Sequence, residues 1–300
     1  MPDLPRLVDA HHHVWNLDHR PQPWLDEPDH APIRRSFGPD DLRSAATRWI
    51  AGRRLDTTVL VQCVASVTET RELLALAARD ALIGAVVGWA DLTSPAIGDT
   101  LDGLRAGPGG RYLRAVRHLV QGEPDPEWLQ RPSVESGLRA VLGRGLGYDI
   151  LIRHHQLGQA ISLAERLPEL PLVLDHAGKP PLVRGELGEW ERRIRRLATY
   201  PQVRCKVSGL VTEADHQRWT LTDIRPVWDV LLSAFGPERL MFGSDWPVCV
   251  LAGGWNRWAA AVEELLAHCS PDETAAILTG TATAFYRLGR PATKGGALCS

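Results

Sequence analysis

Short apolar segments alternate with amphipathic segments along almost the whole chain. The apolar segments lie at residues 6–15, 57–65, 82–92, 112–121, 148–157, 170–180, 203–211 and 240–248. Their centres are continuously apolar, as is typical of parallel strands that are buried on both faces of a sheet. The pattern therefore predicts eight buried parallel strands.

Segments outside these strands carry the spacing of amphipathic helices. Residues 187–200 place leucine, tryptophan and isoleucine on one stripe, with glutamate and arginine on the opposite face. Residues 68–80 show the same arrangement. The segment at 270–278 opens with Ser270 as a helix N-cap and has Glu273 three residues later, which forms a capping box. These patterns predict helices that alternate with the strands.

The alternation of strands and helices defines a fold class. Eight strand–helix units in one uninterrupted chain predict an α/β protein with a (β/α)8 TIM barrel. A doubly wound open sheet is the alternative, but it usually carries a glycine-rich phosphate loop after its first strand, where this chain has histidines. No change of composition marks a boundary, so we expect residues 1–288 to form a single catalytic domain. Residues 289–300, rich in glycine and small side chains, are expected to form a C-terminal tail.

Composition narrows the classes of partner and compartment. The 300 residues carry a formal net charge of −2, which argues against a nucleic-acid partner bound through its phosphates. No run approaches the roughly 20 apolar residues of a membrane helix, and no signal peptide is recognisable. The five cysteines show no CxxC pair, so we expect reduced thiols in a cytoplasmic protein. The sequence leaves open whether the chain is a monomer or a homo-oligomer.

Three consecutive histidines, at residues 11–13, lie within the first apolar segment, directly after its short apolar beginning. If this segment is a strand, His11 and His13 share one face with Cα atoms about 6.5 Å apart, and Asp9 lies deeper on that face. Two imidazoles at this spacing can converge on one ion at roughly 2.1 Å each. His12, between them, is expected to point away from the barrel axis and to be dispensable for chemistry.

Polar residues recur at the carboxyl end of six of the eight predicted strands. They are His11, His13, Arg117, His118, Arg153, His154, His155, Asp175, His176, Lys206, Ser208 and Asp245. An isolated polar group at the end of an apolar strand is costly to bury without partners. Because catalytic groups of a (β/α)8 barrel lie at this end of the strands, the pattern predicts one shared site.

Two kinds of chemistry are compatible with these residue types. Two histidines at i and i+2, with a distant histidine and an aspartate, can form a mononuclear site for a hydrolytic ion such as Zn²⁺. Without a metal, Asp245 can still act as a general base, while a histidine or lysine stabilises an oxyanion. No GxSxG motif is present, so a serine-nucleophile mechanism is not indicated.

Several motifs together resemble a known family. The segments DAHHHVW, AVRHLVQGEP, LVLDHAGKP, CKVSGL and MFGSDWPV are similar, in order and spacing, to the amidohydrolase superfamily (amidohydrolase family 2). Within it, they resemble the branch of sugar-lactone hydrolases and pyrone-dicarboxylate lactonases. The segments PWLDEP and IRRSFGPDDL are similar to the first loop of that branch. The resemblance extends from about Leu7 to Leu288.

The resemblance implies an amidohydrolase-like barrel and a ligand set. His11, His13, His176 and Asp245 match the metal-binding positions, and Asp245 and His176 match the catalytic ones. The superfamily's carboxylated lysine or bridging glutamate at the end of the fourth strand is missing, which argues against a binuclear centre. Members of the branch include metal-containing and metal-independent enzymes. We expect at most one divalent ion, with Zn²⁺ the favoured metal, and leave metal-independent catalysis open.

The function implied is hydrolysis of a small carbohydrate lactone of the aldono type. Asp245 would activate the attacking water. Arg117, His118 and His154 would bind hydroxyls or a carboxylate of this small-molecule partner, with His155 as the alternative to His154, and Trp24 would offer a flat wall to the ring. The alternative is a metal-dependent, non-oxidative decarboxylase of an aromatic or unsaturated acid. A third hypothesis is a non-catalytic sugar-binding barrel.

Overall fold

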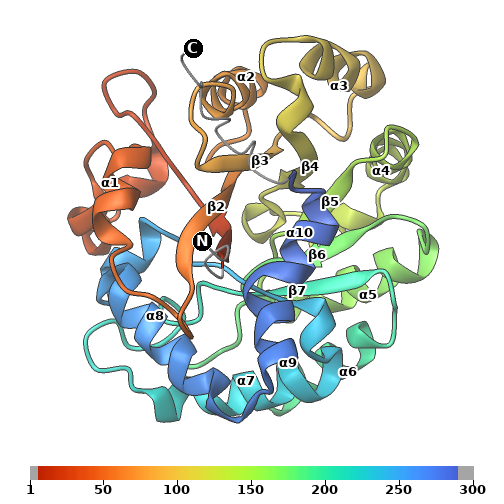
Figure 1. Ribbon diagram of the computed structural model, residues 1–300. Coiled ribbons are helices and arrows are strands. Elements are labelled where there is room, and N and C mark those ends of the chain that lie inside the picture. The colour runs from red at the N-terminus through yellow and green to blue at the C-terminus, as the bar shows by residue number, and fades with distance from the viewer. Residues whose placement is uncertain (1–5, 290–300) are drawn as a thin grey trace, which may run out of the picture.

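Eight parallel strands form the centre of the molecule (Figure 1). The computed structural model describes residues 6–289. The strands are β1 (Arg6–His12), β2 (Arg54–Val61), β3 (Ile83–Gly88), β4 (Leu113–His118), β5 (Gly147–Ile150), β6 (Leu172–Leu174), β7 (Val203–Val207) and β8 (Leu240–Phe242). They pair in chain order, and every pair is parallel. The predicted (β/α)8 barrel is confirmed.

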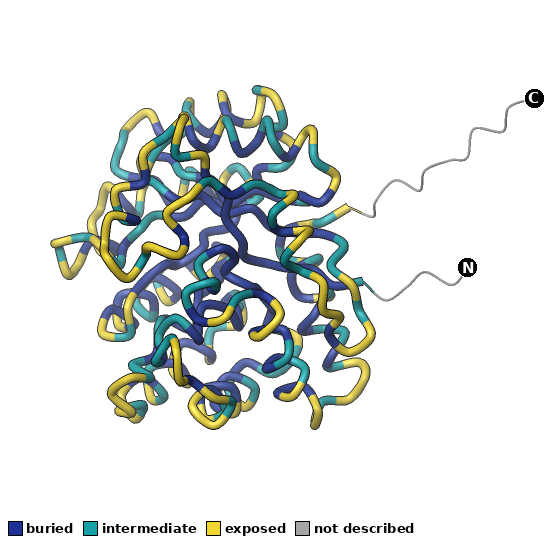
Figure 2. Tube along the Cα trace, turned by 90° about the vertical axis from the view of Figure 1, so that its left-hand side faces the viewer, coloured by how far each residue is buried: buried dark blue, intermediate teal, exposed yellow. Residues whose placement is uncertain are grey.

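Helices surround the barrel, so that burial decreases from the strands to the outer helical faces (Figure 2). They are α1 (Pro39–Ala45), α2 (Val67–Ala77), α3 (Ile97–Ala106), α4 (Pro132–Gly143), α5 (Leu157–Arg166), α6 (Gly188–Ala198), α7 (Leu221–Phe235), α8 (Gly254–Leu265), α9 (Pro271–Ala275) and α10 (Thr281–Tyr286). The helices predicted at 68–80 and 187–200 are α2 and α6. The predicted capping box is also present, because Ser270 and Glu273 exchange hydrogen bonds at the start of α9.

The first and last strands meet through the loop that follows β8. His12 bridges Trp246, and Asp245 N donates to the carbonyl of His11 at 2.8 Å. The pairing of β1 with β2 shifts register between Asp9 and His12, as in a β-bulge. The closure therefore places Asp245 directly against the histidine segment.

Two apolar layers hold the fold together. The larger layer lies between the strands and the surrounding helices. The smaller layer consists mainly of valine and alanine side chains from the strands, together with Ala282 and Tyr286 of α10. Small branched side chains suit the narrow interior of an eight-stranded barrel. The interior is consequently a packed core, and polar groups inside it need partners.

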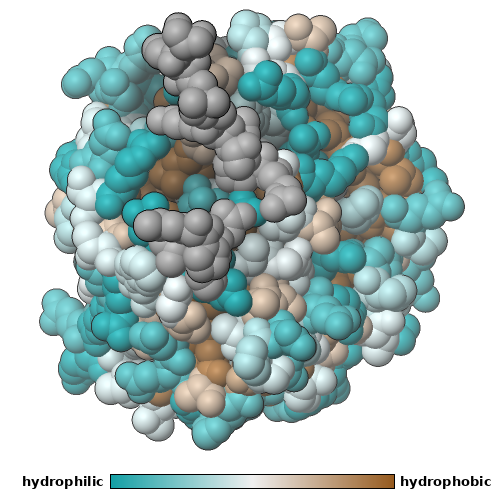
Figure 3. Space-filling view, viewed as in Figure 1, coloured by the Kyte–Doolittle hydropathy of each residue, from teal (hydrophilic) through white to brown (hydrophobic). Residues whose placement is uncertain are grey.

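Helix α10 covers the amino-terminal end of the barrel and crosses the front of the view in Figure 1. Thr279, just before the helix, donates to the carbonyl of Arg6 at the start of β1, and Thr281 donates to the carbonyl of Pro237 before β8. On the face shown in Figure 3, hydrophilic side chains predominate and apolar ones form separate small groups. The predicted tail at 289–300 lies outside the described residues, apart from Gly289.

Two further observations bear on the compartment and partners. Among residues 6–289, no helix is long and apolar enough to cross a membrane. The cysteines within this range, Cys63, Cys205, Cys249 and Cys269, are all free thiols.

Candidate active site

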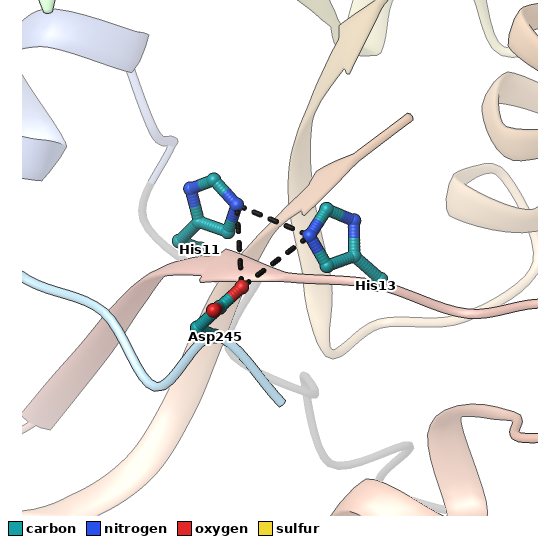
Figure 4. A group of neighbouring side chains, drawn as sticks. All are labelled: His11, His13 and Asp245. Atoms are coloured by element: carbon teal, nitrogen blue, oxygen red, sulfur yellow. Dashed lines mark hydrogen bonds and ion pairs between the residues drawn. The ribbon is translucent and has the colours of Figure 1, made fainter. Parts of the chain in front are cut away.

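Side chains from the first and the last strand regions of the barrel, β1 and the loop after β8, meet in a small triangle (Figure 4). Nε2 of His11 lies 3.2 Å from Nε2 of His13. Oδ1 of Asp245 lies 3.7 Å from the first of these nitrogens and 3.5 Å from the second. All three side chains are buried. The i, i+2 pair and the distant aspartate therefore converge, as the sequence predicted.

His176, at the end of β6, lies beside this triangle. Its Nε2 is 3.9 Å from Oδ1 of Asp245, and its ring centroid is 4.4 Å from that of His11. Its Nδ1 contacts the hydroxyl of Ser208 at 2.9 Å. The four residues predicted as ligands thus come together from β1 and the ends of β6 and β8, while their roles stay a prediction.

The triangle has the dimensions of a metal site. Ligands at about 2.0–2.1 Å in a tetrahedral arrangement stand roughly 3.4 Å apart, and the three edges here measure 3.2, 3.5 and 3.7 Å. His11, Asp175 and His176 form a second overlapping group with ligand atoms within 4.8 Å of one another. Two imidazoles and a carboxylate are a donor set that suits Zn²⁺ and related ions. The residues present therefore fit one divalent ion.

The protonation of the histidines also suits a ligand role. Nδ1 of His13 lies 2.8 Å from the carbonyl of Val61, which can only accept, so in the neutral ring Nδ1 carries the proton and the lone pair of Nε2 faces the triangle. Burial and the neighbouring Lys206 ammonium hold the pKa of His11 well below its usual range. Burial also lowers the pKa of His176. Neutral imidazoles are the form that binds metals.

Asp245 is the ionised partner of this cluster. Burial alone would raise its pKa, but His176, His13 and His11 outweigh burial, so the pKa of Asp245 lies below the ordinary value of an aspartate. The carboxylate is therefore charged at neutral pH. A charged carboxylate at the end of a barrel strand can bind a cation or accept a proton from water.

The backbone around the site adopts left-handed conformations. His176, Ala177 and Lys179 have φ values of 53°, 52° and 54°, and Asp245 has a φ of 57°. Each such conformation costs a non-glycine residue roughly 1–2 kcal/mol. The turn after β6 is buttressed because the indole of Trp190 donates to the carbonyl of Ala177 at 2.8 Å. Strain of this kind that collects around a polar cluster is typical of functional sites.

Two glycines allow the cluster to close. A Cβ on Gly209 would lie 2.5 Å from Nδ1 of His176 and 3.1 Å from Oδ2 of Asp245. A Cβ on Gly243 would lie 2.9 Å from the Cβ of His11. Gly209 was not predicted as a site residue, although its position in the CKVSGL motif was the available signal.

The outcome for Asp9 differs from the expectation. The sequence placed it on the face of His11 and His13, but the register shift after Asp9 breaks the strict alternation of side chains. Its Oδ1 instead accepts the backbone N–H groups of His11 and Ser244, at 3.1 and 2.8 Å. Burial raises the pKa of Asp9 to about 6. Asp9 therefore ties β1 to the loop after β8 and is not part of the ligand triangle.

Arg117 lies inside the barrel beneath the triangle. Its guanidinium is 3.1 Å from Asp175 Oδ2, lies 3.3 Å from Nε2 of His11, and also donates to the carbonyl of Gln62. Burial would raise the pKa of Asp175, but Lys206, His11 and Arg117 hold it well below its usual range. Arg117 is thus next to the site but already paired, and its predicted contact with substrate stays a prediction.

His118 is also paired with protein groups. The indole of Trp89 donates to its Nδ1 at 3.0 Å, so Nε2 carries the proton and donates to Glu123 at 2.7 Å. The ring stacks on Trp128 with centroids 4.0 Å apart. The geometry makes His118 part of a rigid wall, and a direct substrate contact through it stays a prediction.

The remaining predicted substrate residues lie in loops. His154 is half-buried and its Nδ1 donates to the carbonyl of Lys179 at 3.2 Å, whereas His155 is exposed. His154 is therefore the member of the pair that lies against the loop after β6. Trp24 is half-buried, and its indole donates to Gln22 at 2.9 Å. Contacts of His154 and Trp24 with a substrate stay predictions.

Replacing His12 and His13 one at a time by leucine should show which of these two adjacent histidines is needed for catalysis. His12 is fully buried, and neither ring nitrogen has a hydrogen-bond partner among the described residues, so His12→Leu should keep kcat/KM within about threefold without lowering Tm. His13→Leu should lose at least about 100-fold, because it removes a corner of the triangle. Steady-state kinetics and thermal unfolding of both variants check this. Equal losses of kcat/KM would contradict the assignment of His13.

A (β/α)8 barrel that gathers histidines and an aspartate at the carboxyl ends of its strands has the architecture of an enzyme. The sequence model of the amidohydrolase family matches residues 8–288. The chain belongs to the amidohydrolase family.

Several known proteins are similar to this chain over nearly its whole length. An L-fucono-1,5-lactonase from Burkholderia ambifaria is 36% identical over 288 residues, covering 95% of this chain and 96% of its own. The crystal structure of an amidohydrolase from Burkholderia multivorans with bound zinc has a TM-score of 0.87 and 35% identity, covering 95% of this chain and all of its own. A 5-carboxyvanillate decarboxylase from Sphingomonas paucimobilis has a TM-score of 0.58, 16% identity and coverage of 95% and 100%; that likeness shows the fold alone.

Proposed function

We propose that this chain hydrolyses a sugar lactone of the aldono type. The observation that carries the proposal is the convergence of His11, His13, His176 and Asp245 at the carboxyl ends of the strands. The family supports hydrolysis as the reaction class. The relative named L-fucono-1,5-lactonase, which matches over nearly the full length of both chains, supports a small sugar lactone as substrate.

Asp245 is the general base in this proposal. Its carboxylate is ionised because three histidines lower its pKa, so it can take a proton from the water that attacks the lactone carbonyl. We propose that His176, whose Nε2 lies 3.9 Å from Oδ1 of Asp245, donates a hydrogen bond toward the oxygen on which negative charge develops. The ester C–O bond then breaks, the ring oxygen takes up the proton that Asp245 took from the water, and an open-chain hydroxy acid is released.

A divalent ion fits the site, and we propose Zn²⁺. His11, His13 and Asp245, with His176 alongside, would hold it. When bound, such an ion polarises a carbonyl and lowers the pKa of water. The zinc-bound relative and the edges of the triangle support this assignment.

Recognition of the sugar is assigned to the loops around the mouth of the barrel. We propose that His154 and Trp24 contact the lactone, together with Arg117 and His118 at the end of β4. The decarboxylase alternative needs a cation free to hold a substrate carboxylate. Arg117 is already bound to Asp175, and Lys206 is bound to Asp149 and Asp175. These two buried cations are therefore not free to hold a carboxylate, and lactone hydrolysis stays the proposed reaction.

Partners and location are proposed from the same reasoning. A small-molecule lactone is the expected partner, and no nucleic-acid partner is expected from a net charge of −2. A cytoplasmic location stays a prediction based on the cysteine content.

A panel of lactones with and without metal tests the proposed function. L-fucono-1,5-lactone and other aldono-1,5- and aldono-1,4-lactones are mixed with enzyme, and proton release is followed above the spontaneous rate. We expect turnover of at least one aldonolactone, its loss after chelation, and its recovery with Zn²⁺. Failure with every lactone, together with CO₂ release from an aromatic carboxylic acid, would overturn the proposal. If enzyme shown by elemental analysis to be metal-free had full turnover, the proposed metal would be refuted and the proposed lactonase reaction would stand.

A further inference from the structure

A fully buried ammonium lies directly beneath the ligand triangle. Lys206, on β7, has its Nζ 2.6 Å from Oδ2 of Asp149, 2.9 Å from Oδ1 of Asp175 and 3.1 Å from Nδ1 of His11. An ammonium carries three N–H groups and accepts no hydrogen bond. Two carboxylates accept hydrogen bonds from this one and the ring of His11 lies against it, so its position is fixed relative to that ring.

The lower end of this arrangement is tied to the C-terminal helix. The hydroxyl of Tyr286, on α10, donates to Oδ2 of Asp149 at 2.7 Å, the same oxygen that binds Lys206. Tyr286, Asp149 and Lys206 are all fully buried. We call these three residues the axial column. It connects the helix that closes the amino-terminal end of the barrel to a histidine of the site at the other end.

Stability alone does not account for the axial column. The interior around it is otherwise built from apolar side chains such as Val8, Val59 and Ala115. Replacing a buried ion pair by packed apolar groups is often neutral or stabilising, because the charges lose their hydration on burial. The charges of Lys206 and Asp149 therefore need another reason, and the contact with His11 supplies one.

We propose that Lys206, Asp149 and Tyr286 are positioning residues that hold the His11 ring in place for the reaction. This inference rests on the proposed function for its kinetic consequence. Tyr286 anchors the Asp149 carboxylate, Asp149 anchors the ammonium, and the ammonium borders Nδ1 of His11. The opposite nitrogen of that ring, Nε2, is a corner of the ligand triangle.

Tyr286→Phe tests this inference with the smallest structural change, because it removes one hydroxyl and keeps the packed ring. On a lactone that the wild type hydrolyses, kcat should fall about tenfold while KM changes less than twofold, since outer partners of a site typically contribute 10–100-fold. Tyr148→Phe is the matched control. Tyr148 is equally buried, but its hydroxyl has no hydrogen-bond partner among the described residues. The control should leave both constants unchanged.

A spectroscopic readout separates this inference from the proposed function. The ¹⁵N chemical shifts of the His11 ring, measured on metal-free protein without substrate, should move in Tyr286→Phe and stay in place in Tyr148→Phe. These shifts decide the inference even if the wild type hydrolyses no lactone. Unchanged ring shifts in Tyr286→Phe would overturn it.

A charge-balanced double variant guards against a failure to fold. Lys206→Met alone would leave Asp149 and Asp175 facing each other with one cation fewer, which is strongly destabilising. Lys206→Met with Asp149→Asn removes one charge of each sign and keeps an acceptor for Tyr286. We expect this double variant to fold and to lose at least about 100-fold in kcat. A folded double variant with near-normal kcat would contradict the positioning role.

Discussion

Asp245→Asn should leave a folded protein that has lost about 10²–10⁴ in kcat, the usual contribution of a general base. Asparagine keeps the shape and one oxygen of the side chain, but it cannot take the proton from water. Binding of the lactone should change little, because the contacts proposed for the sugar come from the loops. Turnover and Tm, measured on one preparation, check this result.

Asp9→Asn is the matched control for that variant. Asp9 is equally buried, and its Oδ1 accepts two backbone N–H groups, which an asparagine oxygen can still do. Because burial raises the pKa of Asp9 to about 6, the loss of its charge should be tolerated. Turnover should therefore stay within a few-fold of the wild type. Near-normal turnover by the Asp245→Asn variant would refute the role of Asp245 as the general base.

Gly209→Ala should abolish most activity by displacing the two groups that face it. The added methyl would lie 2.5 Å from Nδ1 of His176 and 3.1 Å from Oδ2 of Asp245, at a backbone φ of 60°. Both side chains must move, and misplacing reacting groups by about 1 Å can cost 10²-fold. We expect kcat to fall by about 100-fold or more, as steady-state kinetics would show.

Gly236→Ala separates steric displacement from backbone strain. Gly236 has a φ of 68°, and a Cβ there would meet nothing within 4 Å. It lies between α7 and β8. This variant should lose stability comparable to that lost by Gly209→Ala, yet keep its turnover. If the two variants lose activity equally, the loss comes from general destabilisation and not from the site.

The eight strands were predictable because buried parallel strands leave a continuous apolar signature. The convergence of the candidate site residues was predictable from the same signature. His11, Asp175 and Asp245 interrupt or end apolar segments, and barrel topology brings the carboxyl ends of all strands together. Neither inference needed contacts between distant residues.

Other parts of the site depend on tertiary contacts that no local pattern encodes. The bulge in β1 moved Asp9 out of the predicted row, and a bulge leaves no reliable trace in the order of polar and apolar residues. Asp149 was detectable as the single acidic residue in the apolar segment 148–157. Tyr286 was not, since its contact with Asp149 spans 137 positions of the chain.

The amino-terminal end of the barrel, which α10 covers, is suited to the attachment of other molecules. The described chain begins at Arg6 and its last helix ends at Tyr286, both at the amino-terminal end of the barrel. The triangle of His11, His13 and Asp245 lies at the opposite end of the strands. A fusion partner or a solid support joined directly before Arg6 or directly after Leu288 would therefore lie at the face away from the site. In enzyme immobilised in this way, the carboxyl ends of the strands and the candidate site would face the solution, provided that α10 stays intact.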